Sequence, residues 1–442
     1  MKSIKRILIA NRGEIALRAI RTIKEMGKEA IAVYSKADQD ALYLNYTDGS
    51  VCIGKDRSNE SYLDIPSIVT AADIANCDAI FPGYGFLSEN QDFVEICEHH
   101  GITFIGPSVE VMTLMSDKSK AKEVMKKAGV PVIPGSEGAV DGVEEAIEIA
   151  KEIGYPVIIK AASGGGGRGM RVVQKESEMQ NAYLSAESEA LNAFGDGTIY
   201  MEKFIQRPRH VEVQVLADKH GNVIHLGERD CSLQRRHQKL IEESPATILD
   251  ESTRKELLQT AVKATKAINY ENAGTFEFLV DKDNNFYFME MNTRLQVEHP
   301  VSEMVSNTDI IEWMIKIAEG KELPKQEEIE LKGHAIECRI TAEDPVKFIP
   351  SPGKVTKWII PGGRNVRIDS HIYQNYTVPP YYDSLIAKLI VWGENRERAI
   401  AKMNEALREF EVEGIKTVID FHRHMMKNPD FLNNNYDTNY LS

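Results

Sequence analysis

Two glutamates on neighbouring strand-like segments form the most informative chemical pattern in the sequence. Residues 275–292 (TFEFLVDKDNNFYFMEMN) place two apolar stretches on either side of a short polar turn, which predicts a β-hairpin. If the hairpin closes symmetrically between Asp283 and Asn284, Glu277 lies opposite Glu290, with Cβ atoms about 4.5–5.5 Å apart. Facing carboxylates repel each other and destabilise a hairpin unless a cation lies between them.

This glutamate pair is a candidate metal site. Mg²⁺ prefers oxygen ligands and commonly binds one or two carboxylates together with substrate phosphates. Asn292 follows Glu290 by two residues, so it lies on the same strand face as a candidate further ligand. The alternative is a solvated strand face that carries two glutamates by chance. Apolar residues flank both glutamates, which indicates a partly buried setting and favours the metal.

Three polar residues follow the hairpin at a spacing of two: Arg294, Gln296 and Glu298. In an extended segment all three side chains point to one side. Arginine and glutamine donors suit a small planar oxyanion such as bicarbonate, and a carboxylate beside it can accept its proton. An exposed polar edge strand is the alternative. The position directly after the candidate metal ligands favours an anion site.

A glycine-rich run connects two strand-like segments, 155–160 and 170–173. Residues 164–169 (GGGGRG) match G-x-G-x-x-G, but a dinucleotide-binding loop leads into a helix, whereas this run leads into a β-prone segment. A P-loop is excluded because no Gly-Lys-Ser/Thr follows. Glycine N–H groups can line a phosphate chain, and Lys160 would add a positive charge there. The loop alone fits a surface hairpin equally well; the entropy lost on ordering four glycines favours a lid that closes on ligand.

The elements that must position these residues begin with an α/β region. Short apolar strands alternate with amphipathic helices from residue 7 to about residue 106, which predicts a parallel sheet. The strands are expected at 7–10, 30–34, 79–81 and 103–105. A helical connector is expected from Val109 to Ala128, and alternation in residues 210–215 begins an α+β part.

At 442 residues the chain should form roughly two to four compact units. We predict an α/β and α+β multidomain protein. Its parts are an N-terminal Rossmann-like domain (1–108), a helical connector (109–130), a small lid with the glycine hairpin (131–204) and a large C-terminal part (205–442).

Composition excludes several classes of protein. The formal charge of −14 argues against a nucleic-acid binder, and no apolar run approaches the roughly 18 residues of a membrane span. The apolar stretch 7–10 is too short for a signal peptide. Five dispersed cysteines without a Cys-x-x-Cys pair argue against a zinc site or a disulfide framework, and Cys231 is expected to be a buried structural thiol. We therefore expect a cytoplasmic protein with no nucleic-acid or membrane partner.

Five segments together resemble the ATP-grasp enzymes and, within them, the biotin carboxylases. They are residues 10–16 (ANRGEIA), 82–90 (PGYGFLSEN), 228–239 (ERDCSLQRRHQK), 290–300 (EMNTRLQVEHP) and 379–384 (PPYYDS). The similarity covers essentially the whole chain. It implies an ATP-grasp fold with a mobile lid.

The resemblance also implies roles for matching residues. The phosphates would contact Lys118, Lys160, Gly165, Gly166, Gly167 and His210. The nucleotide pocket would be lined by Glu202, Lys203, Ile205, Gln234, His237 and Leu279. Magnesium, or manganese, would be bound by Glu277 and Glu290 with Asn292 nearby. Bicarbonate would be held by Lys239, Arg294, Gln296, the Val297 amide and Glu298. Arg339 would stabilise the biotin anion, with Tyr84 and Asp383 near the biotin end.

The reaction that the resemblance implies is carboxylation of biotin through carboxyphosphate, with Glu298, Lys239, Arg294 and Arg339 as catalytic residues. Biotin would arrive on a separate carrier protein, because the sequence contains no Met-Lys-Met segment of its own. Carboxyltransferase subunits and a homodimer are further implied. Two alternatives are an ATP-grasp ligase that joins another carboxylate to an amine, and a non-catalytic nucleotide sensor.

Overall fold

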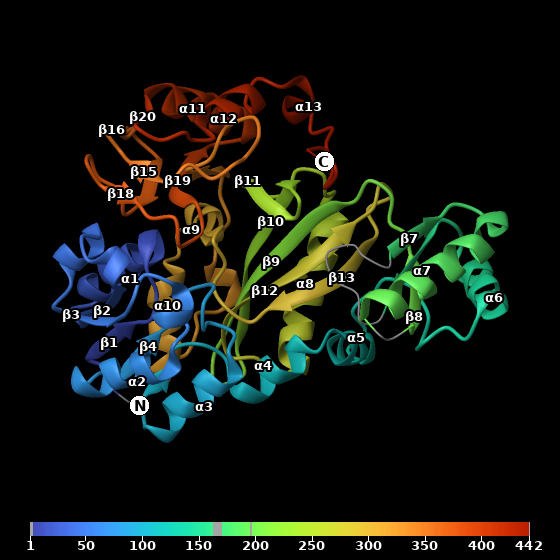
Figure 1. Cartoon of the computed structure of the whole chain (residues 1–442), viewed down its shortest axis with the longest axis horizontal. Coiled ribbons are helices and arrows are strands. Elements are labelled where there is room, and N and C mark those ends of the chain that lie inside the picture. The colour runs from blue at the N-terminus through green and yellow to red at the C-terminus, as the bar shows by residue number, and fades with distance from the viewer. Residues whose placement is uncertain (1–2, 162–169, 195–196, 442) are drawn as a thin grey trace. The chain divides into compact units, whose positions relative to one another are not determined.

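The computed structural model describes residues 3–161, 170–194 and 197–441 (Figure 1). The glycine run, with Gly165, Gly166 and Gly167, lies outside these residues. By its internal contacts the chain divides into two compact units. Unit 1 comprises Met1–Val130, Arg209–Phe278 and Glu290–Ser442, and unit 2 comprises Pro131–Pro208 and Leu279–Met289. Among the described helices, none combines the length and apolarity needed to cross a membrane.

The N-terminal part of unit 1 is the predicted parallel sheet. Its strand order is β3-β2-β1-β4-β5, formed by β1 (Arg6–Ile9), β2 (Glu29–Ser35), β3 (Gly49–Gly54), β4 (Ala79–Phe81) and β5 (Thr103–Phe104). Ile7 and Ile9 pack into one core cluster and Leu8 into another, because alternate side chains leave a strand on opposite faces. Each face is therefore covered, by α1 (Gly13–Glu25) on one side and by α2 (Ile65–Ile74) and α3 (Gln91–His99) on the other.

The helical connector expected from Val109 to Ala128 consists of two helices. Helix α4 (Val109–Ser116) ends before Asp117, and α5 (Lys118–Lys127) begins after it. The Asp117 backbone is extended, and its carboxylate accepts hydrogen bonds from two backbone N–H groups of α5. Asp117 therefore acts as an N-cap and starts a second helix within the connector.

An eight-stranded sheet carries most of the residues with candidate chemistry. Its order is β13-β12-β9-β10-β11-β14-β19-β17. The strands are β9 (Arg209–Ala217), β10 (Val223–Arg235), β11 (Gln238–Ser244), β12 (Asn272–Val280), β13 (Phe286–Asn292), β14 (His334–Thr341), β17 (Val366–Ser370) and β19 (Leu385–Gly393). The long β9, β10 and β12 are prominent in Figure 1.

Strand β9 explains the alternation in residues 210–215. All nine residues of β9 are buried, the polar ones included. Val211, Val213 and Val215 are fully buried hydrophobic residues, whereas Glu212 lies on the opposite face among charged side chains. The polar half of the alternation therefore marks an internal polar site and not a solvent-exposed face.

The hairpin of β12 and β13 is present, but its turn differs from the prediction. The Asp281 N–H donates to the Asn285 carbonyl at 2.9 Å, so the turn is centred on Asp283 and not between Asp283 and Asn284. Asn284 adopts a left-handed backbone conformation with φ of 64°. Asparagine tolerates this conformation and so permits a three-residue turn. The symmetric two-residue closure is therefore wrong, and the direct opposition of Glu277 and Glu290 that depended on it does not follow, because a turn centred on Asp283 shifts the pairing by one residue.

The remaining helices of unit 1 are α8 (Glu251–Ala267), α9 (His299–Ser306), α10 (Ile310–Ala318), α11 (Arg396–Glu409), α12 (Ile419–Met425) and α13 (Pro429–Leu432). Two small ladders pair β15 (Gly353–Lys354) with β18 (Thr377–Val378) and β16 (Lys357–Ile359) with β20 (Glu411–Glu413).

Unit 2 is built on the antiparallel sheet β7-β6-β8, formed by β6 (Val157–Ala161), β7 (Met170–Val173) and β8 (Ile199–Lys203). Its helices are α6 (Val143–Ile153) and α7 (Met179–Phe194).

Helix α9 is fixed in place by a buried ion-pair network. Glu303 accepts hydrogen bonds from Arg18 of α1 at 3.0 Å and from Arg367 of β17 at 2.7 Å. Burial alone would raise the pKa of Glu303, but the two guanidinium groups outweigh burial and lower the pKa to about 2. The carboxylate therefore joins three elements that are distant in sequence, and it fixes the helix that begins directly after Glu298.

We predict that Glu303→Gln loses stability in a pH-dependent way. The folded-state pKa of Glu303 is below its unfolded value of about 4.3, so its contribution is complete above that pH and disappears as the pH falls toward 2. The difference in unfolding free energy between wild type and variant should be about 3 kcal/mol near neutral pH and should shrink between pH 5 and about 2. Urea titrations at several pH values measure it. A difference that stays constant with pH would contradict the ion-pair interpretation.

Candidate functional site

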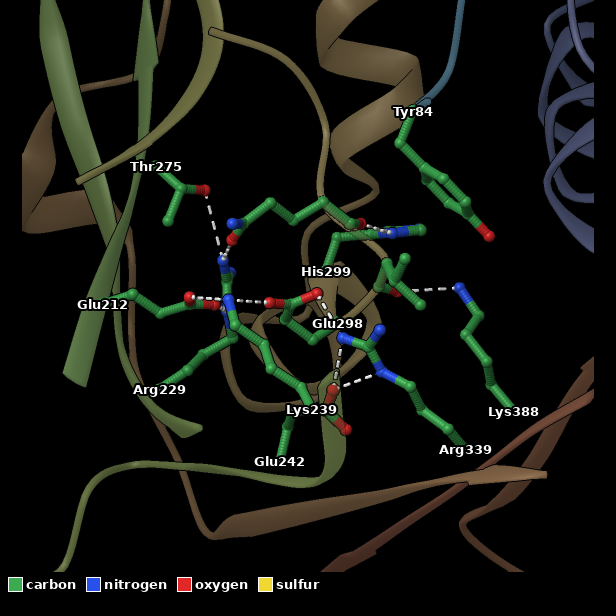
Figure 2. A network of polar contacts seen from close by, with 12 residues as sticks. Tyr84, Glu212, Arg229, Lys239, Glu242, Thr275, Glu298, His299, Arg339 and Lys388 are labelled. Atoms are coloured by element: carbon green, nitrogen blue, oxygen red, sulfur yellow. Dashed lines mark hydrogen bonds and ion pairs between the residues drawn. The ribbon is translucent and has the colours of Figure 1, made fainter. Parts of the chain in front are cut away.

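A buried lysine lies at the centre of the site (Figure 2). Lys239 on β11 contacts Glu212 at 2.6 Å, Glu298 at 2.6 Å and Glu277 at 3.1 Å. Burial alone would lower the pKa of Lys239, but the three carboxylates raise it well above its ordinary value. Lys239 is therefore a permanent cation that brings β9, β12 and the start of α9 to one point.

Arg229 on β10 holds this cluster together through hydrogen bonds of its guanidinium. Its side chain is fully buried, and its guanidinium donates to Glu212 at 2.6 Å, to Gln296 Oε1 at 2.8 Å and to three further oxygens. Those oxygens belong to Gln214, Ser302 and Thr275. Arginine has five N–H donors, and each has an acceptor here. Glu212 consequently bridges two buried cations, Arg229 and Lys239.

Glu298 is an ionised carboxylate between two cations. It lies at the N-terminal end of α9, and its oxygens contact Lys239 at 2.6 Å and Arg339 at 2.9 Å. Burial by itself would raise the pKa of Glu298, but Lys239, Arg339 and Arg229 lower it well below its usual range. In this state Glu298 has little affinity for a proton. Any process that withdraws these cations would raise that affinity.

The segment before Glu298 is not the extended strand that its spacing predicted. Residues 293–298 form bends and a turn after β13 ends at Asn292. Gln296 nevertheless points into the cluster and donates to Glu277 at 2.6 Å, while Arg294 donates to Asn292 at 2.8 Å and to Glu89 at 2.8 Å. The prediction that all three polar side chains share one strand face is wrong, because the chain turns toward α9. The three side chains still contact one connected polar network.

The candidate metal ligands have two different environments. Glu277 is buried and is contacted by Lys239, by Asn292 Nδ2 at 2.8 Å and by His210 Nε2 at 2.9 Å. Glu290 has 42% of its side chain exposed, and its carboxylate lies 3.5 Å from the exposed Lys118. An oxygen-rich, partly solvated set with a lysine beside it suits Mg²⁺ that carries substrate phosphates. These residues therefore fit the ion.

A second acidic group, which shares Glu277 with the first, already has a cation beside it. His210, Glu212 and Glu277 have ligand atoms within 4.8 Å of one another. Lys239 already contacts both carboxylates of this group, at 2.6 Å and 3.1 Å. In the unliganded chain Lys239 is therefore the cation that balances these two carboxylates.

Two further positively charged groups extend the site toward Tyr84. Arg339 on β14 donates to Glu242 at 2.5 Å as well as to Glu298. Lys388 on β19 is fully buried, donates to the Val297 carbonyl at 2.9 Å and contacts Glu14 at 3.2 Å. Tyr84 donates its hydroxyl to Glu14. Figure 2 shows Arg339 and Lys388 on the same side of Glu298 as Tyr84.

The remaining predicted residues are placed as follows. Gln234 is buried at the end of β10, His237 is exposed in the β10–β11 turn, and Asp383 is exposed and caps Leu385. Within unit 2, Lys160 contacts Glu202, Lys203 donates to the Gly154 and Tyr155 carbonyls, Ile205 is buried, and Leu279 is half-buried. Cys231 is fully buried and burial raises its thiol pKa well above the ordinary value, as a structural thiol requires.

Segments that carry the family resemblance lie far apart in the sequence but meet in the folded chain. Asn11 donates to the Pro82 and Tyr84 carbonyls at 2.7 and 2.8 Å, which fixes the backbone that carries Tyr84. Glu89 accepts from Arg294 at 2.8 Å and from the Thr293 N–H at 2.9 Å. With the bonds from Arg229 to Gln296 and from Lys239 to Glu298, four of the five segments are joined by direct hydrogen bonds.

Several residues of the network were not predicted from sequence. Arg229 lies inside the segment 228–239, and its place in that segment was the available signal. Glu212 could have been found from its polar alternation in β9. Glu14 likewise lies inside the segment 10–16. Glu242 and Lys388 had no local signal, because each lies in an ordinary strand and only the pairing of distant strands brings it to the site.

The sequence matches three family descriptions that together cover nearly the whole chain. Residues 3–112 match "Biotin carboxylase, N-terminal domain", residues 117–326 match "Carbamoyl-phosphate synthase L chain, ATP binding domain", and residues 337–442 match "Biotin carboxylase C-terminal domain". A curated biotin carboxylase from Nostoc sp. is 57% identical over 438 residues, covering 99% of this chain and 98% of that protein. The chain belongs to the biotin carboxylase family.

Solved structures agree with this assignment. A biotin carboxylase from Campylobacter jejuni in complex with a nucleotide, named as β-γ-ATP, is 72% identical, with a TM-score of 0.92 and coverage of 99% of this chain and 98% of that chain. The biotin carboxylase domain dimer of a Hydrogenobacter thermophilus 2-oxoglutarate carboxylase, in complex with MgADP, ADP and bicarbonate, is 49% identical with a TM-score of 0.90. That match covers 100% of this chain and 98% of the domain. The biotin carboxylase fold is therefore an ATP-grasp fold, and members of the family are ATP-dependent ligases.

We predict that Arg229→Met strongly destabilises this biotin carboxylase. The substitution leaves Glu212 with a buried negative charge opposite Lys239 alone, and breaking a buried pair typically costs about 3–5 kcal/mol. Arg408→Met is the matched control, because Arg408 and Glu405 are 71% and 65% exposed and such pairs contribute about 0–1 kcal/mol. Urea unfolding of both variants measures the effect. Equal, small losses would show that the Arg229 network contributes no more than a surface pair.

Proposed function

We propose that this biotin carboxylase uses MgATP and bicarbonate to form carboxyphosphate and then carboxylates N1 of biotin on a separate carrier protein. The observation that carries the proposal is the pair of cations around one ionised carboxylate: Lys239 and Arg339 on either side of Glu298. Such a site can hold an anion and accept its proton. The reaction itself is inferred from membership of the biotin carboxylase family.

The nucleotide and its metal ion are assigned to residues of both units. Glu277 and Glu290 would hold Mg²⁺, with Asn292 beside them and Lys118 supplying a charge to the phosphates. When bound, Mg²⁺ supplies charge neutralisation at the phosphates. Within unit 1, His210, Gln234 and His237 are assigned to ATP. Within unit 2 the assigned residues are Lys160, Glu202, Lys203, Ile205, Leu279 and the glycines 165–167.

Bicarbonate is assigned to Lys239, Arg294, Gln296, the Val297 amide and Glu298. An anion bound near Lys239 and Arg294 would take part of the positive charge that now stabilises ionised Glu298. The affinity of Glu298 for a proton would then rise, which is what a general base for bicarbonate requires. The low proton affinity of Glu298 in the unliganded chain is thus compatible with its role as a base.

Biotin is assigned to the Arg339 side of the site, with Tyr84 and Asp383 near it. Arg339 is a permanent cation because Glu242 and Glu298 raise its pKa further despite burial. A permanent guanidinium can stabilise the ureido anion that forms when biotin loses its N1 proton. The carboxyphosphate that this scheme uses must be shielded from water, which is the task assigned to the glycine run.

The biotin carboxylase acts with a biotin carrier protein and a carboxyltransferase. We further propose that it is a homodimer located in the cytoplasm. The final carboxyl acceptor belongs to the partner subunits, and acetyl-CoA, propionyl-CoA and pyruvate are the candidates. Identification of the biotinylated protein that co-purifies with the chain, together with its transferase, would select among them.

We predict that Glu298→Gln abolishes carboxylation and leaves nucleotide binding nearly unchanged. The amide cannot take the proton of bicarbonate, so bicarbonate-dependent ADP release should fall by about 10²–10⁴-fold. The wild type should release ADP in response to bicarbonate and free biotin. Glu413→Gln, a substitution of an exposed glutamate, is the control and should behave like wild type. ADP release that needs an amine and ignores bicarbonate would overturn the proposal in favour of another ATP-grasp ligase.

We also predict that Glu290→Gln raises the Mg²⁺ concentration needed for half-maximal activity by at least about tenfold, because one anionic ligand is lost. Folding should be unaffected, since Glu290 is 42% exposed. Activity at increasing Mg²⁺ and constant ATP measures the shift. An unchanged Mg²⁺ requirement would remove Glu290 from the metal site.

A further inference from the structure

Two buried glutamates on neighbouring strands face each other next to Arg339. Glu242 on β11 and Glu337 on β14 are register partners in an antiparallel ladder. Side chains of such partners leave the sheet on the same face, with Cβ atoms about 4.5–5.5 Å apart. Both side chains are fully buried. This pair lies outside every motif that the sequence indicated.

The two carboxyl groups have few polar partners. Glu242 Oε1 accepts from Arg339, whereas Glu242 Oε2 and both oxygens of Glu337 have no hydrogen-bond partner among the described residues. The face that carries Glu337 is packed by Val301 and Ile390, which are buried hydrophobic residues. If both carboxylates were ionised they would repel each other, and three of their four oxygens would be buried without a hydrogen-bond donor in the described part of the chain. A single proton between them would replace that repulsion by an O–H···O hydrogen bond.

We infer that Glu337 is a protonated carboxylic acid that shares its proton with Glu242, and that this pair is a positioning device for Arg339. The role given to Arg339 rests on the proposed function. Arg339 is held between Glu298 at 2.9 Å and Glu242 at 2.5 Å. With one proton in the pair, a single negative charge faces Glu298 across the guanidinium. Without that proton, a second negative charge would draw Arg339 toward the pair and oppose an anion on biotin.

The surroundings of the pair agree with this assignment. The charged and titratable groups that interact with it are Arg339 on β14, Lys239 on β11, Lys388 on β19 and Glu298 at the start of α9. On the other face of the sheet Glu243 is paired with His334 and Arg396. Burial raises the pKa of Glu242 to about 7 and that of Glu337 well above its ordinary range, in spite of Arg339 and Lys388. The pair titrates as one system.

Infrared difference spectroscopy tests the proton directly. The full-length wild type at pH 7 should show a C=O band of a protonated carboxylic acid that Glu337→Gln lacks. Glu14→Gln is the control: Glu14 is another buried carboxyl with a pKa raised to about 7, and its removal should leave the Glu337 band in place. Identical carboxylic-acid bands in wild type and Glu337→Gln would overturn the inference. If Glu337→Gln does not fold, the band is followed with ¹³C-labelled glutamate in Glu14→Gln, which removes the other raised carboxyl; the band must shift with the label and disappear at alkaline pH, and a missing band overturns the inference.

The pH profile tests the effect on Arg339. Glutamine keeps a donor and an acceptor, so kcat for biotin carboxylation at pH 7 should stay within about twofold of wild type. At alkaline pH the wild type loses the shared proton, and KM for free biotin should rise in wild type but not in Glu337→Gln. If KM for biotin changes with pH in the same way in wild type and in Glu337→Gln, the role of Glu337 is merely structural and the inference is overturned. A wild type that fails to carboxylate biotin at any pH refutes the proposed function instead, while the infrared result stands separately.

Discussion

The contact of Lys239 with three buried carboxylates is the constraint on which the site depends. Each of these charges is unfavourable inside a protein unless an opposite charge lies within hydrogen-bond distance. Glu212, Glu277 and Glu298 come from β9, β12 and the start of α9, so their charges are satisfied only when these elements adopt one relative position. Arg229 on β10 adds the same constraint, because its buried charge is satisfied only when β10 lies beside Glu212 of β9. The network therefore specifies geometry more than it adds stability.

The eight-stranded sheet positions the charged residues of the site. Strands β11 and β14 place Lys239 and Arg339 on either side of Glu298, and the N-terminal sheet contributes Tyr84 and Glu89 through loops at its strand ends. Substrate anions would compete with carboxylates for cations that are already in place. An unliganded site that satisfies its own charges thus avoids reorganisation when the reaction begins, which is how a preorganised site stabilises charge.

Patterns with a local cause were predictable from sequence. The parallel sheet of residues 6–104 and the strands of the Glu277 hairpin follow from hydrophobic periodicity. Details that depend on one side chain were not. Asp117 divides a helix by capping, Asn284 sets a three-residue turn by a left-handed backbone, and the chain after Asn292 bends where alternation predicted extension. Propensity alone cannot weigh a cap or a turn against the contacts that surround it.

The sequence by itself determined the family, the ATP-grasp architecture and the residues that carry donors and acceptors, because motifs and periodicity are local properties of the chain. Only the tertiary structure decided how those residues are charged and which others support them. Lys388, Glu242 and Glu337 gain their neighbours from strand register, and burial then shifts the protonation of each carboxyl. Electrostatic energies depend on distance and on solvent exposure, and neither quantity exists until distant strands have paired.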